Sequence, residues 1–335
     1  MSLCGRWSWR LVSAHGGQWH EFVSPDWQFD YRRRVAGEAK AEMGGCDGAQ
    51  RFAEWCDTLE VWCDGDIAES FIVESIEPDG EGNYEITGVG AFELARKRRI
   101  AVTETLTGSA GQVWAELWQI MNGIAPTGLT PSVNSGGPSI TLELTAGDLF
   151  EDPLGTLGVY VTWAQHGGVL YDWLAGEEPR QGRPLTYEWV TSFTCDTQGM
   201  FDAGSVVNNI EFAYGPSLES LFVWPENGNP DGKLLQSPRL NFPEITDREQ
   251  MRQLANQWGP TLAAPEPVLP DIALNPATTQ FMDLLPGVWH NDQHTPHTGY
   301  AFNMAAVELE GTSDCLETIT AGMDQGDSAI RNRLR

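Results

Sequence analysis

The sequence predicts a mainly β protein with a few helices, of the α+β class, in which two β-barrel-like modules flank a helix-bearing middle region. Apolar residues alternate at Leu59, Val61 and Cys63, which is the period of a half-buried strand. The segment 78–83, Pro-Asp-Gly-Glu-Gly-Asn, separates two β-forming runs, as the loop of a hairpin does. The chain also holds 36 Gly and 20 Pro, a content that favours many turns.

The first β-module is expected over residues 1–105. Apolar residues alternate at Trp7, Trp9 and Leu11, so further strands precede the hairpin. Several short strands with closely spaced turns are typical of a small barrel or sandwich. This stretch contains no nucleophile motif, phosphate-binding loop or metal cage, which favours a structural protein.

The middle region, residues 106–189, is expected to contain a helix and strands. Thr107 and Ser109 offer N-cap oxygens, and Asn122-Gly123 is a typical helix end. The helix should bury one stripe and two neighbouring indoles: Val113, Leu117, Ile120 and Met121, with Trp114 and Trp118. Strands are expected at 139–144, 158–163 and 169–173.

The second β-module is expected over residues 190–325, with a helix at about 247–258 inserted in it. Thr246 and Glu249 match a capping box, and Gly259-Pro260 is expected to end the helix. Residues 225–242 look like a loop, and residues 326–335 are expected to form a peripheral tail. The strands expected in this part are 187–195, 209–214, 271–274, 300–309 and 312–320.

The charge balance excludes several function classes. The chain carries 47 acidic and 20 basic residues, a formal net charge of -27. Gripping a nucleic-acid backbone or an anionic membrane surface needs clustered Lys and Arg, so neither is expected. The basic runs 32–34 and 96–99 are expected to pair with nearby carboxylates. The N-terminal segment MSLCGRWSWRLVSAHGG has no long apolar core, so no signal peptide is predicted. No apolar stretch reaches about 18 residues, so no membrane span is predicted.

One group of residues has the chemistry of a metal site. His290, Asp292, His294 and His297 lie close together in the sequence, and imidazole with carboxylate can ligate zinc or iron. Their neighbours, however, are those of a loop, and a metal site needs fixed geometry and supporting contacts. We therefore expect solvated loop histidines at the tip of a hairpin and no metal, with a metal-dependent protein as an alternative.

The cysteines and the aromatic residues raise two more hypotheses. The six cysteines form no CxxC pair, and without a secretion signal buried free thiols are expected: Cys4, Cys46, Cys56, Cys63, Cys195 and Cys315. As an alternative, Cys4, Cys46, Cys56 and Cys63 could surround zinc or an iron–sulfur cluster, but their spacings match no known pattern. Fourteen Trp and 47 acidic residues would suit a sugar cleft, but no catalytic pair stands out. The expectation is no enzyme, no catalytic residue and no cofactor; a carbohydrate-binding or cell-wall-glycan-cleaving β-protein is the alternative.

Eight segments, taken in order along the chain, match one known pattern: DYRRRVAGEAKAEM, LEVWCDGDIAESFIVESIE, YEITGVGAFELARKRRI, GSAGQVWAELWQIMNG, VVNNIEFAYG, REQMRQLANQWG, FMDLLPGVW and AFNMAAVELEG. With these segments the chain resembles the tail-hub proteins of long-tailed phages, of the type often labelled minor tail proteins in phages of actinobacteria. That family shares the fold of the baseplate hub of contractile-tailed phages. Residues 146–186 depart from the family pattern.

The resemblance implies a homotrimeric ring in the virion, assembled in the host cytoplasm and placed at the distal end of the tail tube. Its expected neighbours are the distal tail protein or tube, the tape-measure protein and tail-tip fibres or spikes, with no sequence-specific nucleic acid. The ring would form part of the DNA channel. Trp7, Trp27 and Trp62 are candidates for burial between subunits, because tight interfaces enrich Trp.

Overall fold

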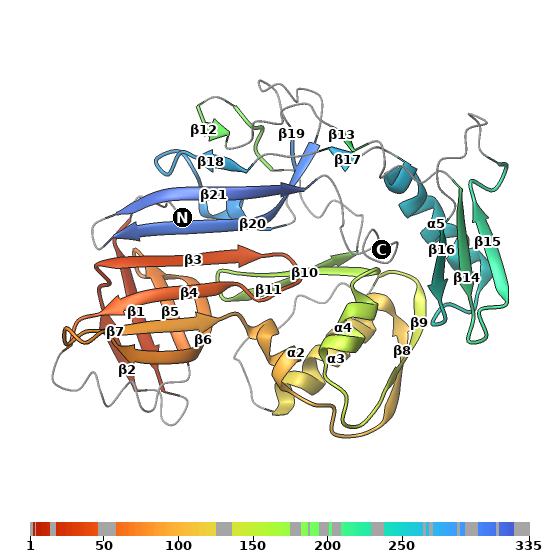
Figure 1. Ribbon diagram of the computed structural model, residues 1–335, viewed down its shortest axis with the longest axis horizontal. Coiled ribbons are helices and arrows are strands. Elements are labelled where there is room, and N and C mark those ends of the chain that lie inside the picture. Colours follow the sequence, from red (N-terminus) through yellow and green to blue (C-terminus); the bar gives the residue numbers. More distant parts are fainter. Residues whose placement is uncertain are drawn as a thin grey trace.

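The computed structural model of the chain describes residues 3, 5–13, 18–45, 58–124, 136–174, 182–186, 188–193, 201–202, 209–228, 238–263, 266–267, 271–286, 289–291, 301–312 and 315–324. This part of the chain is mainly β with a few helices, which confirms the predicted fold class (Figure 1). A large sheet lies at one end of the molecule, a helix-bearing region lies beside it, and a small sheet with one long helix lies at the other end.

Twelve strands form the large sheet, in the order β12-β18-β21-β20-β3-β4-β7-β6-β5-β1-β2, with β19 paired to β20. In β5, Leu59, Val61 and Cys63 are buried and the residues between them are half-buried, because successive side chains point to opposite faces. The strands are β1 (Trp7–Val12), β2 (Trp19–Phe22), β3 (Asp26–Arg32), β4 (Glu38–Met43), β5 (Thr58–Cys63), β6 (Asp66–Pro78), β7 (Tyr84–Val89), β12 (Val190–Phe193), β18 (Ile272–Leu274), β19 (Trp289–Asn291), β20 (Ala301–Thr312) and β21 (Leu316–Asp324).

The β3–β20 pair joins the two ends of the chain. The two strands are antiparallel, with Phe29 opposite Leu309, so strands from residues 1–105 and from residues 190–325 share one sheet. The path of described strands has β12 at one edge and β2 at the other, and within it the two modules do not close into separate barrels. The backbone ladder therefore couples the modules, and their boundaries remain a prediction.

The helix-bearing region is built around α3 (Ala110–Ile124). The Ser109 hydroxyl oxygen accepts a hydrogen bond from the Gln112 backbone nitrogen at 3.4 Å, which is an N-cap contact. The predicted stripe and both indoles are core: Val113, Trp114, Leu117, Trp118 and Met121 are buried and Ile120 is partly buried. The other elements are η1 (Ala91–Glu93), α2 (Leu94–Lys97), β8 (Glu104–Ser109), β9 (Ser139–Leu144), α4 (Glu151–Leu157), β10 (Val161–His166) and β11 (Val169–Leu174).

The β10–β11 hairpin differs in its start from the prediction. Residues 158–160 form a turn after α4, closed by the Gly158 and Tyr160 backbone nitrogens, so β10 begins at Val161. The hairpin turn itself is Gly167-Gly168, with φ of 64° and 68°. A two-residue turn of this kind needs positive φ at both positions, which glycine adopts without strain.

The small sheet at the far end consists of three strands. β14 pairs antiparallel with β15 and parallel with β16, and α5 covers one face. The prediction that residues 225–242 are all loop was wrong at β16, whose Leu240 and Phe242 are buried beside β14. The elements are β14 (Ile210–Tyr214), β15 (Ser220–Trp224), β16 (Arg239–Phe242) and α5 (Arg248–Ala263), with β13 (Phe201–Asp202), β17 (Glu266–Pro267) and η3 (Phe281–Leu284) nearby in sequence.

The helix α5 corrects two details of the prediction. Asp247, not Thr246, caps it, because its Oδ1 accepts the Gln250 backbone N–H at 3.0 Å. The helix continues through Gly259-Pro260 to Ala263, since the predicted apolar stripe (Met251, Leu254, Ala255 and Trp258) is buried and Leu262 extends it. Tertiary packing here outweighs the tendency of proline to end a helix.

Candidate interaction surfaces

His290 is buried, so the expectation of solvated histidines was wrong for this member of the histidine segment. It lies on β19, its Nδ1 is 2.8 Å from the Arg183 carbonyl oxygen, and its ring centroid is 5.1 Å from that of Trp189. Burial lowers the pKa of His290, and the Arg183 carbonyl partly offsets the effect. These contacts fix the start of the β19–β20 hairpin.

The other members of that segment, Asp292, His294 and His297, lie outside the described residues. Among the described residues, no three His, Cys, Asp or Glu side chains gather as a metal site would require. The prediction of no metal at this hairpin therefore stays a prediction.

The cysteine expectations have a mixed outcome. Burial is the main cause that raises the pKa of Cys63 to about 11, as expected for an inert core thiol. Cys315 is exposed, so the expectation of buried thiols was wrong there. Cys4, Cys46 and Cys56 lie outside the described residues, and the zinc or iron–sulfur alternative is not tested.

The basic runs are engaged within the chain, and members of each run pair with carboxylates. Arg32 pairs with Asp30, Arg96 pairs with Glu151 at 3.0 Å and Lys97 pairs with Glu74 at 2.9 Å. Three other arginines donate to oxygens that carry no charge: Arg34 to the Thr162 hydroxyl, and Arg98 and Arg99 to the Met121 and Gly147 carbonyls.

Two of the three predicted interface tryptophans belong to the core. Trp7 and Trp27 are 1% and 2% exposed, and their ring centroids lie 4.9 Å apart inside the large sheet. The prediction was wrong for both, because alternation turns Trp7 of β1, opposite Cys63, and Trp27 of β3 into the same core. Trp62, on the opposite face of β5, is half-buried and stays a candidate.

A stack of aromatic and basic side chains lies near the β2 edge of the sheet, and the sequence pointed only to its Trp62. The Arg10 guanidinium lies 4.7 Å from the Trp19 ring centroid and 3.8 Å from that of Trp62. Arg10 also pairs with Glu21 at 3.2 Å. Trp19 is 54% exposed. Trp and Arg are the residues that contribute most at protein interfaces, and cation–π contacts hold them in place.

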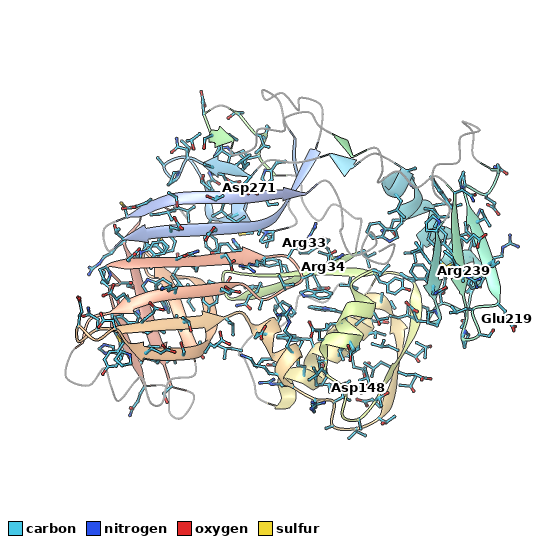
Figure 2. The ribbon with its side chains drawn as sticks, viewed as in Figure 1. Arg33, Arg34, Asp148, Glu219, Arg239 and Asp271 are labelled. Carbon is cyan, nitrogen blue, oxygen red and sulfur yellow. The ribbon has the colours of Figure 1, made fainter. Side chains whose placement is uncertain are left out.

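A second exposed apolar surface lies on β15, at the other end of the long axis (Figure 1). Leu221 and Val223 are 47% and 42% exposed, and they alternate with the buried Phe222. Figure 2 shows Glu219 and Arg239 at the same end of the molecule. β15 is an edge strand of the described small sheet, so its outer backbone groups are available for pairing.

A small cavity lies where α4, η1 and the end of β3 meet. It has a volume of about 200 Å³, and its lining includes Phe92, Leu154 and Trp163 together with Arg34 and Glu151. Small-molecule sites usually measure about 300–1,000 Å³. This cavity is therefore smaller than a typical ligand site and carries no catalytic arrangement.

The described residues contain no helix with the length and apolar character that a bilayer crossing requires.

Comparison with known proteins identifies structures that share this fold. No family model matches the chain, and no curated protein matches it. Several solved structures, however, match the chain in fold. The 43 kDa tail protein of prophage MuSo2 from Shewanella oneidensis matches with a TM-score of 0.62 and 11% identity, over 96% of this chain and 99% of that chain. Prophage tail protein gp18 from Listeria monocytogenes matches with a TM-score of 0.60 and 10% identity, over 98% and 97%.

A component of a type VI secretion system is also similar. The E. coli c3393 protein, described as similar to the T4 tail proteins gp27 and gp5, matches with a TM-score of 0.52 and 6% identity, over 92% of this chain and 74% of that chain. At such identities the likeness shows the fold alone. The chain has the fold of phage tail proteins, and the fold extends to proteins with likeness to a baseplate hub.

Proposed function

We propose that the chain is a structural subunit of a phage tail, namely the tail hub at the distal end of the tail tube. The observation that carries the proposal is the fold match to the Shewanella tail protein, which spans 96% of this chain and 99% of that chain. A match of nearly whole chain to whole chain supports a like role better than one shared domain would. The similar structures come from Shewanella, Listeria and E. coli, so they lend no support to an actinobacterial-phage type.

The proposed assembly is a homotrimeric ring. A ring needs two different surfaces on each subunit that meet around the axis. The exposed Trp19 edge and the exposed β15 strand are two such surfaces, at opposite ends of the molecule (Figure 1). The ring would link the distal tail protein or tube to tail-tip fibres or spikes, meet the tape-measure protein and surround part of the DNA channel. It would do so as a virion component assembled in the host cytoplasm.

The proposed role is mechanical and not catalytic. The similar structures are named as tail proteins, and the tryptophans that would suit a sugar cleft are mostly core, among them Trp114, Trp118 and Trp258. Incubation with host cell-wall glycan separates this proposal from the carbohydrate alternative. Specific pull-down or turnover of the glycan would support the alternative, and neither is expected.

Copy number around the tail axis tests the hub proposal. Electron microscopy of assembled tails is expected to show three copies of this chain at the tip. One, two or six copies, or a place in the capsid, would contradict it. The charge of -27 opposes association at low salt, so the purified chain should form trimers more readily as ionic strength rises.

Matched variants test the Trp19 edge within that assembly. Trp19→Ser should lower the trimer fraction at a given concentration. Val102→Ser removes an apolar residue that is 65% exposed and lies between α2 and β8, outside β2 and β15, and it should leave the fraction unchanged. Sizing by light scattering after chromatography measures both. Equal trimer fractions for the two variants would remove Trp19 from the interface.

A further inference from the structure

The turn of the β10–β11 hairpin is fixed to the large sheet through one buried carboxyl group. Glu69, on β6, is 1% exposed. Its Oε1 accepts three N–H groups: Gln165 Nε2 at 2.9 Å, the Ser70 backbone at 2.8 Å and the Gly168 backbone at 3.1 Å. Its Oε2 is buried and has no hydrogen-bond partner among the described residues. The carboxyl group is therefore well bonded on one side only.

Gln165 extends this contact to the helix-bearing region. Its Oε1 accepts the Ala91 backbone N–H at 2.9 Å, at the start of η1, while its Nε2 donates to Glu69 and to the Ser70 carbonyl. Figure 2 shows Arg33 and Arg34 at the same junction, where the Arg34 backbone N–H donates to the Trp163 carbonyl at 2.8 Å. The large sheet and the helix-bearing region thus meet at the hairpin.

Burial opposes a negative charge at this contact. Burial is the largest cause that raises the pKa of Glu69, to about 7, while Gln165 and the backbone N–H groups of Ser70, Gly168 and Gly167 act against it. An anion with one oxygen lacking a donor costs free energy in an apolar interior.

Three titratable groups on neighbouring strands keep one charge state near neutral pH. Tyr31 on β3 has a pKa raised well above its usual value by burial and then by Glu69. Burial also raises the pKa of Cys63 on β5 to about 11. His166 on β10 lies between the rings of Tyr31 and Phe281, each centroid 4.3 Å away, and burial lowers its pKa to about 3. Of these groups, only Glu69 changes charge between pH 5.5 and pH 8.5.

We propose that Glu69, Gln165 and Gly168 form a proton-dependent latch. The protonated carboxyl holds the β10–β11 hairpin and the helix-bearing region on the large sheet, and the ionised carboxyl loosens them. The proposal rests on this contact and not on the hub function.

The direction of the pH dependence follows from linkage. The docked state binds the proton more tightly than the undocked state, where the carboxyl has its ordinary pKa of 4.5. The contribution of Glu69 to docking is therefore largest below pH 4.5. It decreases as the pH rises towards 7 and stays constant at higher pH. With pKa values of 7 and 4.5, the docking equilibrium constant falls about 30-fold between pH 5.5 and 8.5.

Hydrogen exchange on the full chain tests the latch. After correction for the intrinsic exchange rate, protection of the hairpin amides in 161–174 should fall about 30-fold between pH 5.5 and 8.5, if exchange proceeds through undocking. Amides of α5 should show no such fall. Glu69→Gln, which imitates the protonated carboxyl, should remove the pH dependence. Glu77→Gln, an exposed position on the same strand, should retain it.

Two outcomes would overturn the proposal. Constant hairpin protection in the wild-type protein from pH 5.5 to 8.5 would do so without any variant. An equal fall in Glu69→Gln would assign the pH dependence to another group. Infrared difference spectra of the wild-type protein between pH 5.5 and 8.5 give an independent readout, because a protonated carboxyl band should disappear near pH 7 and this change should be missing from Glu69→Gln.

Discussion

Substitution of Gly259 by alanine is expected to destabilise the small sheet and α5, although alanine favours helices. A Cβ atom at this position would lie 2.6 Å from Nε1 of Trp224 and would overlap the indole ring. Trp224 ends β15 and packs against the core that α5 shares. Overpacking of this kind costs about 1–3 kcal/mol, while replacing glycine inside a helix recovers about 1 kcal/mol. The net loss of unfolding free energy is therefore about 1 kcal/mol.

A double-mutant cycle separates the two terms. Urea unfolding should give a lower midpoint for Gly259→Ala than for the wild-type protein. In a Trp224→Ala background the overlap is gone, so the same substitution should be neutral or should stabilise by about 1 kcal/mol. A Gly259→Ala protein that is more stable than wild type would refute the packing argument, and so would an equal effect in both backgrounds.

Two further substitutions or modifications test local features. Asp247→Ala should lower the unfolding free energy by about 1 kcal/mol, because the α5 cap is lost. Thr246→Ala should have a smaller effect in urea unfolding. Equal effects of the two substitutions would support the capping box predicted from the sequence. A thiol reagent at neutral pH should modify the exposed Cys315 before the buried Cys63. Peptide mapping by mass spectrometry measures the order of modification. The reverse order would contradict the assigned burial of the two thiols.

Local periodicity was enough to predict the elements whose partners lie close in the sequence or whose stripe is long. The β5–β6–β7 meander and α3 belong to this group, because alternation and the 3.6-residue stripe are properties of the segment itself. The pairing of β3 with β20 was not predictable in this way. Its two strands are about 270 residues apart, and nothing in either strand specifies the other.

Elements whose stability comes from their neighbours were missed. β16 has four residues and reads as loop, yet Leu240 and Phe242 are buried beside β14. α4 is short and contains Pro153 and Gly155, which argue against a helix in isolation. In both cases burial against an element distant in sequence outweighs intrinsic preference, which a single sequence does not display.

The interface tryptophans show what alternation does and does not decide. The two-residue period of a strand shows which side chains share a face, and it correctly groups Trp7 with Trp9 and Leu11. It also indicates the inward face, since that group is apolar and the alternate residues Ser8 and Arg10 are polar. Naming Trp7 as an interface residue overlooked this information.

The buried contact at Glu69 lies where a polar residue interrupts an apolar segment of the sequence. The segment 67–73, IAESFIV, is apolar except for two residues, and one of them, Glu69, is buried. A carboxyl group in a core strand is costly unless something in the fold uses it, so its presence requires a partner across the sheet. The structure supplies Gln165 and Gly168, which lie almost one hundred residues away. The sequence thus indicates that a polar contact must exist on β6, and only the fold indicates that it joins the sheet to the hairpin.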